Sequence, residues 1–165
     1  MITVRAVTST TDFDYDRLYA DSYEAMASGT YVWPDGMIDE AERKTYFANW
    51  INGVMVDPMN FKAFVVCIND VDMIYFTAWM QGNVAWLQCA LVAYDDNGSK
   101  AYHAGEQFIN TWKTYLSGLG AAQIGVLMLR NSPTRQVVMS VYNIPESAME
   151  FHGYDCERGL IPNEE

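Results

Sequence analysis

Three cysteines and two histidines are the residues of this chain best suited to a zinc-type metal site or to disulfides. The cysteines, Cys67, Cys89 and Cys156, are odd in number and lack a C-x-x-C spacing, so they match neither a disulfide framework nor a zinc motif. His103 and His152 lie far apart in the sequence and have no H-x-x-x-H partner. We therefore expect no metal site, and we expect the cysteines to be small core residues of a protein in a reducing compartment.

The charge balance limits the partners of the chain. It has 10 Lys and Arg residues against 21 Asp and Glu residues, a formal net charge of −11. Nucleic-acid binding requires a clustered basic face that neutralises phosphates, so we expect no nucleic-acid partner. An acidic surface would suit a cationic substrate such as an amine, or it could serve solubility alone.

Length and composition predict one globular domain over residues 1–165. Half of the residues are apolar and 19% are charged, which suits a chain that buries one hydrophobic core. No apolar run approaches the roughly 20 residues that span a bilayer, and Met1 to Thr11 does not resemble a signal peptide. We expect a cytoplasmic protein with no membrane partner.

The hydrophobic pattern predicts the elements that must position any site. Strands follow an alternation of period two, and helices follow three- and four-residue steps. The expected elements are a strand over Met1 to Ser9, helices over Phe13 to Gly29 and Asp39 to Val54, strands over Phe61 to Ile68, Met73 to Met80 and Val84 to Tyr94 with turns at Asn69 to Asp72 and Gln81 to Asn83, a helix from Ala101 to its stop at Gly120, a strand over Ala122 to Arg130, a helix from Pro133 to Tyr142, and an extended segment over Ala148 to Leu160.

These elements predict an α/β fold with a mixed sheet. The three middle strands form an antiparallel meander. The helix after them is a crossover, which makes the strands over Val84 to Tyr94 and Ala122 to Arg130 parallel neighbours.

The order strand, helix, helix, three strands, helix, strand, helix, strand is similar to that of the GNAT superfamily of acyl-coenzyme-A-dependent N-acyltransferases. The resemblance extends over nearly the whole chain and rests on topology more than on motifs. It implies transfer of an acetyl or other short acyl group from acetyl-coenzyme A, or another acyl-coenzyme A, to the amine of a small molecule or a peptide.

The family's pyrophosphate loop has the pattern R/Q-x-x-G-x-G/A before a helix, where backbone N–H groups and the helix N-terminus suit an anion. One alignment places Lys100 to Gly105 there, with His103 in the position of a glycine. A second alignment uses Gly98 and Ser99, and an ordinary turn with a helix cap is equally compatible with the sequence. The resemblance implies as cofactor-binding residues Leu91, Val92, Ala93, Ser99, Lys100, Ala101, His103, Ala104, Gly105 and Asn131.

Tyr142 is the tyrosine that the resemblance implies as the general acid for the leaving thiolate. The family's spacing of seven from an asparagine to this tyrosine runs from Asn131 to Val138, whereas Tyr142 fits that spacing only from Arg135. Tyr142 could instead be a core or rim aromatic. A base is also needed, and Asp95 and Asp96 could act through a water or simply form the turn.

Tyr31 and Trp33 lie in a loop where the family builds the wall of its acceptor site, and we expect them to bind the substrate or to pack under the loop.

A narrower resemblance is to a GNAT-like internal virion protein of short-tailed phages, carried by Met1 to Arg5, Ser9 to Phe13 and Lys100-Ala101. It implies an inactive protein with a binding or structural role, located in a virion, with a virion protein as its partner. A homodimer is the other expected assembly. A fold alone does not decide between these functions.

Overall fold

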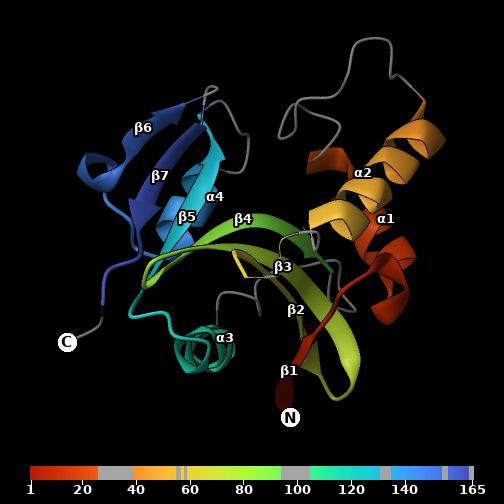
Figure 1. Cartoon of the computed structure of the whole chain (residues 1–165), viewed down its shortest axis with the longest axis horizontal. Helices are drawn as coiled ribbons and strands as arrows, with labels where there is room; N and C mark the ends of the chain where they lie inside the picture. Colours follow the sequence, from red (N-terminus) through yellow and green to blue (C-terminus); the bar gives the residue numbers. More distant parts are fainter. Residues whose placement is uncertain are drawn as a thin grey trace.

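The computed structural model describes residues 1–25, 39–54, 57, 59–93, 105–130, 135–153 and 156–163. Within this part of the chain, seven strands form one sheet in the order β1-β2-β3-β4-β5-β7-β6 (Figure 1). In chain order the elements are β1 (Ile2–Ala6), the 3₁₀ helix η1 (Thr10–Asp12), α1 (Tyr15–Ala25), α2 (Glu40–Val54), β2 (Phe61–Ile68), β3 (Val71–Gln81), β4 (Val84–Val92), α3 (Glu106–Gly118), β5 (Gln123–Leu129), α4 (Arg135–Val141), the 3₁₀ helix η4 (Glu146–Ala148), β6 (Glu150–Gly153) and β7 (Cys156–Leu160).

The mixed sheet predicted from the sequence is confirmed. β4 and β5 are parallel, and every other neighbouring pair is antiparallel. The parallel pair follows from α3, which connects the end of β4 to the start of β5 as a helical crossover.

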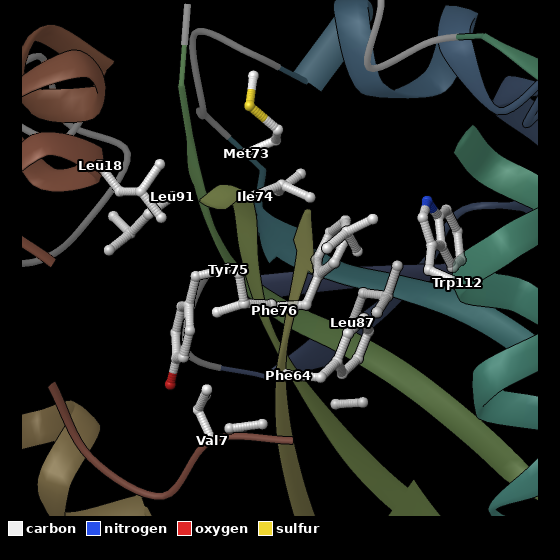
Figure 2. Packing of buried hydrophobic residues seen from close by; sticks show 14 of the residues in the cluster. Val7, Leu18, Phe64, Met73, Ile74, Tyr75, Phe76, Leu87, Leu91 and Trp112 are labelled. Atoms are coloured by element: carbon white, nitrogen blue, oxygen red, sulfur yellow. The ribbon is translucent and has the colours of Figure 1, made fainter. Parts of the chain in front are cut away.

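Helices cover both faces of the sheet. α1 and α2 lie on one face and α3 lies on the other (Figure 1). Figure 2 shows Leu18 of α1 beside Leu91 of β4 on the first face, and Trp112 of α3 on the second. All three side chains are fully buried, so the core has two layers, one on each side of the sheet.

The two layers are filled by alternate residues of β3, because successive side chains of a strand point to opposite faces. Tyr75 stacks on Phe13, with ring centroids 4.7 Å apart. Its neighbour Phe76 points the other way and meets Trp112 at 5.4 Å (Figure 2). Such aromatic pairs add packing energy beyond the area they bury.

One predicted turn and one predicted helix end are confirmed by their backbone angles. Asn69 and Asp70, between β2 and β3, have φ of 50° and 66°, as the two central residues of a tight hairpin turn require. Gly120 has φ of 105° and ends α3, where Ala121 N–H donates to the Leu116 carbonyl at 3.1 Å.

The C-terminal segment differs from the prediction. A single extended stretch was expected over Ala148 to Leu160, whereas the structure has η4 followed by two strands, β6 and β7, that pair with each other. Gly153 ends β6 with φ of 128°, a conformation that favours glycine and lets the chain turn back. The described part of α4 ends at Val141, so Tyr142 lies just after the helix. None of the described helices is both long and apolar enough to cross a membrane.

Candidate active site

The parallel strands β4 and β5 pair only over their first halves. Their register joins four residue pairs, from Val84 with Gln123 to Leu87 with Val126. Beyond these pairs β4 continues to Val92, held by β3, and β5 continues to Leu129, held by β7. Among the described residues, the edges that β4 and β5 turn toward each other therefore have no strand partner in their second halves.

Beyond Leu87 and Val126 the two strands no longer pair, and we call the region between their second halves, Gln88 to Val92 and Leu127 to Leu129, the divergence. A β-bulge lies where this divergence begins. Thr77 of β3 pairs with Cys89, but the next residue, Ala78, pairs with Leu87, so Gln88 of β4 has no partner on β3. An extra residue bends the bulged strand and increases its twist. We attribute the divergence of β4 from β5 to this bulge.

The backbone groups that β4 turns toward the divergence belong to alternate residues. Ala93 N–H donates to the Met73 carbonyl of the β3 segment at 2.8 Å, so Ala93 and, two residues earlier, Leu91 face β3. Ala90 and Val92 then face the divergence. Val92 N–H is already engaged, because it donates to the Ser22 hydroxyl of α1 at 2.8 Å.

Three residues at the end of β4 were predicted to bind the cofactor. Leu91 and Ala93 are fully buried, and Val92 is half-buried. The structure thus places Val92 on the divergence and directs the backbone of Leu91 and Ala93 to β3. Sequence reasoning missed Ala90 and Ser22. The alternation of the strand could have identified Ala90 once its pairing was known, whereas Ser22 carried only the signal of a helix face turned inward.

The start of α3 is where the pyrophosphate loop was expected. Gly105 is the N-cap, with no side chain to cap the first turn. The N–H groups of a helix's first turn have no partner within the helix, which suits an anion. The first-turn acid Glu106 works against a polyanion, since it is an exposed negative charge.

A surface cavity of about 560 Å³ runs along this helix. It lies on the face of α3 turned away from Phe108, Trp112 and Leu116, which are the buried residues of the helix. It is lined by Glu106, Gln107, Asn110, Thr111 and Thr114.

Most of the predicted loop residues lie outside the described residues. They are Tyr31, Trp33, Asp95, Asp96, Ser99, Lys100, Ala101, His103, Ala104 and Asn131. Both alignments of the pyrophosphate loop therefore stay open, as does the acceptor wall. Among the residues that are described, no group of three His, Cys, Asp or Glu side chains has the geometry of a metal site.

Tyr142 lies beside α3. Its ring meets the ring of Trp112 edge-on, with centroids 5.7 Å apart and planes at 81°. The phenol of Tyr142 is protonated at neutral pH, as any tyrosine is, and burial raises its pKa, which makes it a weaker acid than an exposed tyrosine. A protonated phenol is the form that a general acid needs, and the same contact also makes Tyr142 part of the core rim.

Arg135 lies seven residues before Tyr142, where the family pattern has an asparagine. Its side chain belongs to a cluster of ion pairs. Its guanidinium donates to Glu157 of β7 and in a fork to Glu146 of η4, at 3.0 and 2.6 Å. Hydrogen bonds from Arg135 lower the pKa of Glu146. The cluster joins α4 to the β7 strand, so Arg135 has a structural role in positioning α4.

The sequence matches no protein-family model and no curated protein. The fold, however, is similar to that of solved acetyltransferases. The PaiA N-acetyltransferase of Thermoplasma acidophilum in complex with coenzyme A has 12% identity and a TM-score of 0.59 over 97% of this chain and 99% of that one. Mycobacterium smegmatis RimJ in complex with CoA-disulfide has 13% identity and a TM-score of 0.60 over 97% of this chain and 80% of that one.

A third structure, from Desulfovibrio desulfuricans, is described as an acetyltransferase of the GNAT family. It has 10% identity and a TM-score of 0.54 over 97% of this chain and 96% of that one. At such identities the likeness concerns the fold. The narrower resemblance to a phage virion protein receives no support from these structures. The chain has the fold of the GNAT acetyltransferases.

Proposed function

We propose that this chain is an acyl-coenzyme-A-dependent N-acyltransferase that transfers an acetyl group to an amine. The divergence of β4 and β5 carries the proposal, because it leaves two strand edges whose backbone groups lack a strand partner in the part of the chain that the structure describes. Such edges can hold an extended arm with amide groups, as an added strand would be held. The pantetheine arm of coenzyme A has this chemistry.

The residues have separate roles in this proposal. Ala90 would bind the arm through its backbone, and Val92 would do so after the arm displaces the Ser22 hydroxyl. The pyrophosphate would lie before α3, held by Ser99, Lys100, Ala101, His103, Ala104 and Gly105, with Asn131 after β5 as a further contact. Tyr31 and Trp33 would enclose the acceptor amine.

Acyl transfer to an amine needs one proton removed and one supplied. Asp95 or Asp96 would take the proton of the attacking ammonium through a water. Tyr142 would donate its phenolic proton to the departing thiolate. The phenol is protonated at neutral pH, and burial, which raises its pKa, makes it a weaker acid than an exposed tyrosine.

Calorimetry with acetyl-coenzyme A at millimolar concentration tests the proposal directly. We expect measurable heat of binding with one site per chain. The absence of heat at that concentration would contradict the proposal. His103→Gly restores the glycine of the family pattern, and we expect it to tighten binding if the histidine obstructs the pyrophosphate.

The second candidate function is that of a GNAT-fold protein that binds another protein and does not catalyse. One observation favours it: the Val92 N–H, which faces the divergence, is occupied by the Ser22 hydroxyl at 2.8 Å. This function predicts no binding of acetyl-coenzyme A to the wild type or to His103→Gly.

A further inference from the structure

A tryptophan and an arginine stack on each other near the point where β4 and β5 diverge. The guanidinium carbon of Arg158, on β7, lies 4.9 Å from the ring centroid of Trp86, on β4. Gln81 holds both side chains, since its Oε1 accepts from Arg158 at 3.2 Å and from the Trp86 indole N–H at 3.3 Å. Trp86 is buried and Arg158 is half-buried.

Gly125 of β5 makes this contact possible. β5 lies between β4 and β7, so the Trp86 ring must cross it to reach Arg158. A Cβ on Gly125 would lie 2.4 Å from a ring atom of Trp86, far too close for a real side chain. The ring therefore lies directly over the glycine.

The register places the pair at the start of the divergence. Trp86 is one residue before the last β4 residue that pairs with β5. Arg158 pairs with Leu127, which is the first β5 residue after the last pair with β4.

The pair lies on the face of the sheet that carries α1 and α2. Trp86 pairs with Trp79 of β3, so the two side chains lie on the same face of the sheet. Trp79 is four residues after Tyr75 on β3 and shares its face, on which Tyr75 packs against Phe13. Trp79 also meets His152 of β6 edge-on at 5.8 Å. Three strands separate β3 from β6, about 19 Å in a flat sheet. The sheet must therefore curl on this face, as the rise of β5, β7 and β6 above β4 in Figure 1 indicates.

Arg158 makes no ion pair with a carboxylate of the described residues. Arg5, Arg17 and Arg135 each pair with an acid, whereas the contacts of Arg158 with the described residues are to the Trp86 ring and the Gln81 amide oxygen. Glu150 is its cross-strand neighbour, yet it forms no ion pair with it. In a chain with 21 acidic residues, a half-buried arginine without a carboxylate leaves its guanidinium donors available to a ligand.

We propose that Arg158 and Gln81 bind the carboxylate of the acceptor, so that the acceptor is an amine that also carries a carboxylate, as an amino acid does. The inference rests on the proposed function. Arg158 would offer its forked N–H groups to the two carboxylate oxygens. The Gln81 oxygen is used by Trp86 and Arg158, so its NH₂ group can donate to the same carboxylate.

The charge of the site selects a monoanion. One guanidinium balances one carboxylate, and a chain of net charge −11 disfavours a phosphate group with a second negative charge. Trp79 and His152 beside the pair would contact an aromatic or apolar side chain of the acceptor. The amine would then extend toward the unpaired edge of β5 that begins at Leu127.

The test measures binding of L-phenylalanine to the full chain in the absence of coenzyme A. Binding is monitored by NMR as a shift of the indole N–H resonance of Trp86. The chain has five tryptophans, and Trp86→Phe assigns the resonance. We expect a saturable shift with L-phenylalanine at millimolar concentration, and a shift at least tenfold weaker with phenethylamine, which lacks the carboxylate. Arg158→Gln should weaken binding of L-phenylalanine by about tenfold or more, the usual loss for a hydrogen bond to a charged group.

Lys113→Gln on α3 is the control, because it makes the same change in charge away from Trp86, and it should bind L-phenylalanine as the wild type does. Circular dichroism shows whether each variant is folded. Equal binding of phenethylamine, tighter binding of inorganic phosphate, unchanged binding by folded Arg158→Gln, or no shift at all would overturn the inference. Because no coenzyme A is present, a chain that binds L-phenylalanine but shows no heat with acetyl-coenzyme A would contradict only the proposed function.

Discussion

The Ser22 hydroxyl of α1 forms two hydrogen bonds with one backbone residue, Val92 of β4. It accepts from the Val92 N–H at 2.8 Å and donates to the Val92 carbonyl at 3.3 Å. Ser22 is buried, so the contact is shielded from water. It attaches α1 to the strand edge that would receive coenzyme A, and a ligand would have to displace it to use Val92.

Ser22→Ala is expected to lower stability and to raise affinity for coenzyme A. The variant loses the tether of α1 and leaves a buried N–H unpaired, a cost of about 1–3 kcal/mol. A bound ligand could then pair with that N–H, so we expect severalfold tighter binding of acetyl-coenzyme A by calorimetry. Ser117→Ala on exposed α3 surface is the control. Weaker binding by folded Ser22→Ala would show that Ser22 helps to form the site.

Gly125→Ala is expected to destabilise the protein strongly. The added Cβ would lie 2.4 and 2.6 Å from two Trp86 ring atoms and 2.8 Å from the Gly159 carbonyl oxygen. Forcing such contacts into a packed core costs about 1–3 kcal/mol or more. Urea unfolding measures the loss.

Gly118→Ala provides the comparison, because a Cβ there meets nothing within 4 Å and the residue ends α3. Its stability should be unchanged or higher by up to about 1 kcal/mol. A double variant, Gly125→Ala with Trp86→Leu, should recover part of the loss. Equal stability of Gly125→Ala and Gly118→Ala would contradict the account of the Trp86 ring over β5.

The sequence predicted the elements best where periodicity and turn residues agreed. The alternation around Tyr75 and Phe76 identified β3, and Gly120 marked the end of α3. The parallel pair β4 and β5 followed from the helix between them, which is a topological rule. By contrast, the hairpin of β6 and β7 was predicted as one segment, because short strands carry little periodic signal.

The site was predicted less well than the fold. Which residues of β4 face the divergence depends on the bulge at Gln88 and on the partner strand, and neither leaves a local pattern in the sequence. The Trp86–Arg158 pair joins residues far apart in the chain across Gly125, so only the register of three strands brings them together.

Asp72→Asn is expected to lower stability at neutral pH and to flatten its decrease in acid. Asp72 accepts hydrogen bonds from the Asp14 N–H at 2.8 Å and from Arg5 at 3.0 Å. Burial alone would raise the pKa of Asp72, but these bonds and that of Cys67 bring it below the ordinary value. With a lowered folded pKa, the stabilisation is full above the unfolded pKa of about 3.9 and is lost as the pH falls through the folded pKa.

Urea unfolding of wild type and Asp72→Asn between pH 7 and pH 2 measures this effect. We expect a loss of about 2 kcal/mol at pH 7 and a smaller difference at pH 2, where the wild-type carboxylate is protonated. Asp70→Asn, in the exposed turn nearby, should follow the wild type, since asparagine tolerates its positive φ. A difference that stays constant with pH would mean that the charge of Asp72 contributes nothing.

Thr77→Val is expected to stabilise the protein. Thr77 lies on β3 with no exposed surface, and its hydroxyl has no hydrogen-bond partner among the described residues. Valine has nearly the same shape and removes a buried unpaired polar group, which is worth about 1 kcal/mol. Thr111→Val is the control, because the Thr111 hydroxyl donates to the Gln107 carbonyl at 2.7 Å. A loss of stability in thermal unfolding would show that the Thr77 hydroxyl is paired in solution.

Tyr142→Phe separates the two roles of Tyr142. Phenylalanine keeps the edge-on contact with Trp112, so unfolding in urea should change by less than about 1 kcal/mol. If the phenol protonates the leaving thiolate, kcat for acetyl transfer should fall by about 10²- to 10⁴-fold with little change in coenzyme-A affinity. Because burial raises its pKa, Tyr142 should add no decrease in rate between pH 7 and pH 9.

Tyr115→Phe is the matched control, since Tyr115 is also a half-buried tyrosine beside an aromatic ring, that of Phe64 at 5.1 Å, and its pKa is also raised by burial. It lies on the core face of α3, where no step of the reaction is proposed. The acid role requires a fall in kcat for Tyr142→Phe that Tyr115→Phe does not show. Equal kcat for both variants would leave Tyr142 as a packing residue only, and the proton of the leaving group would then have to come from water.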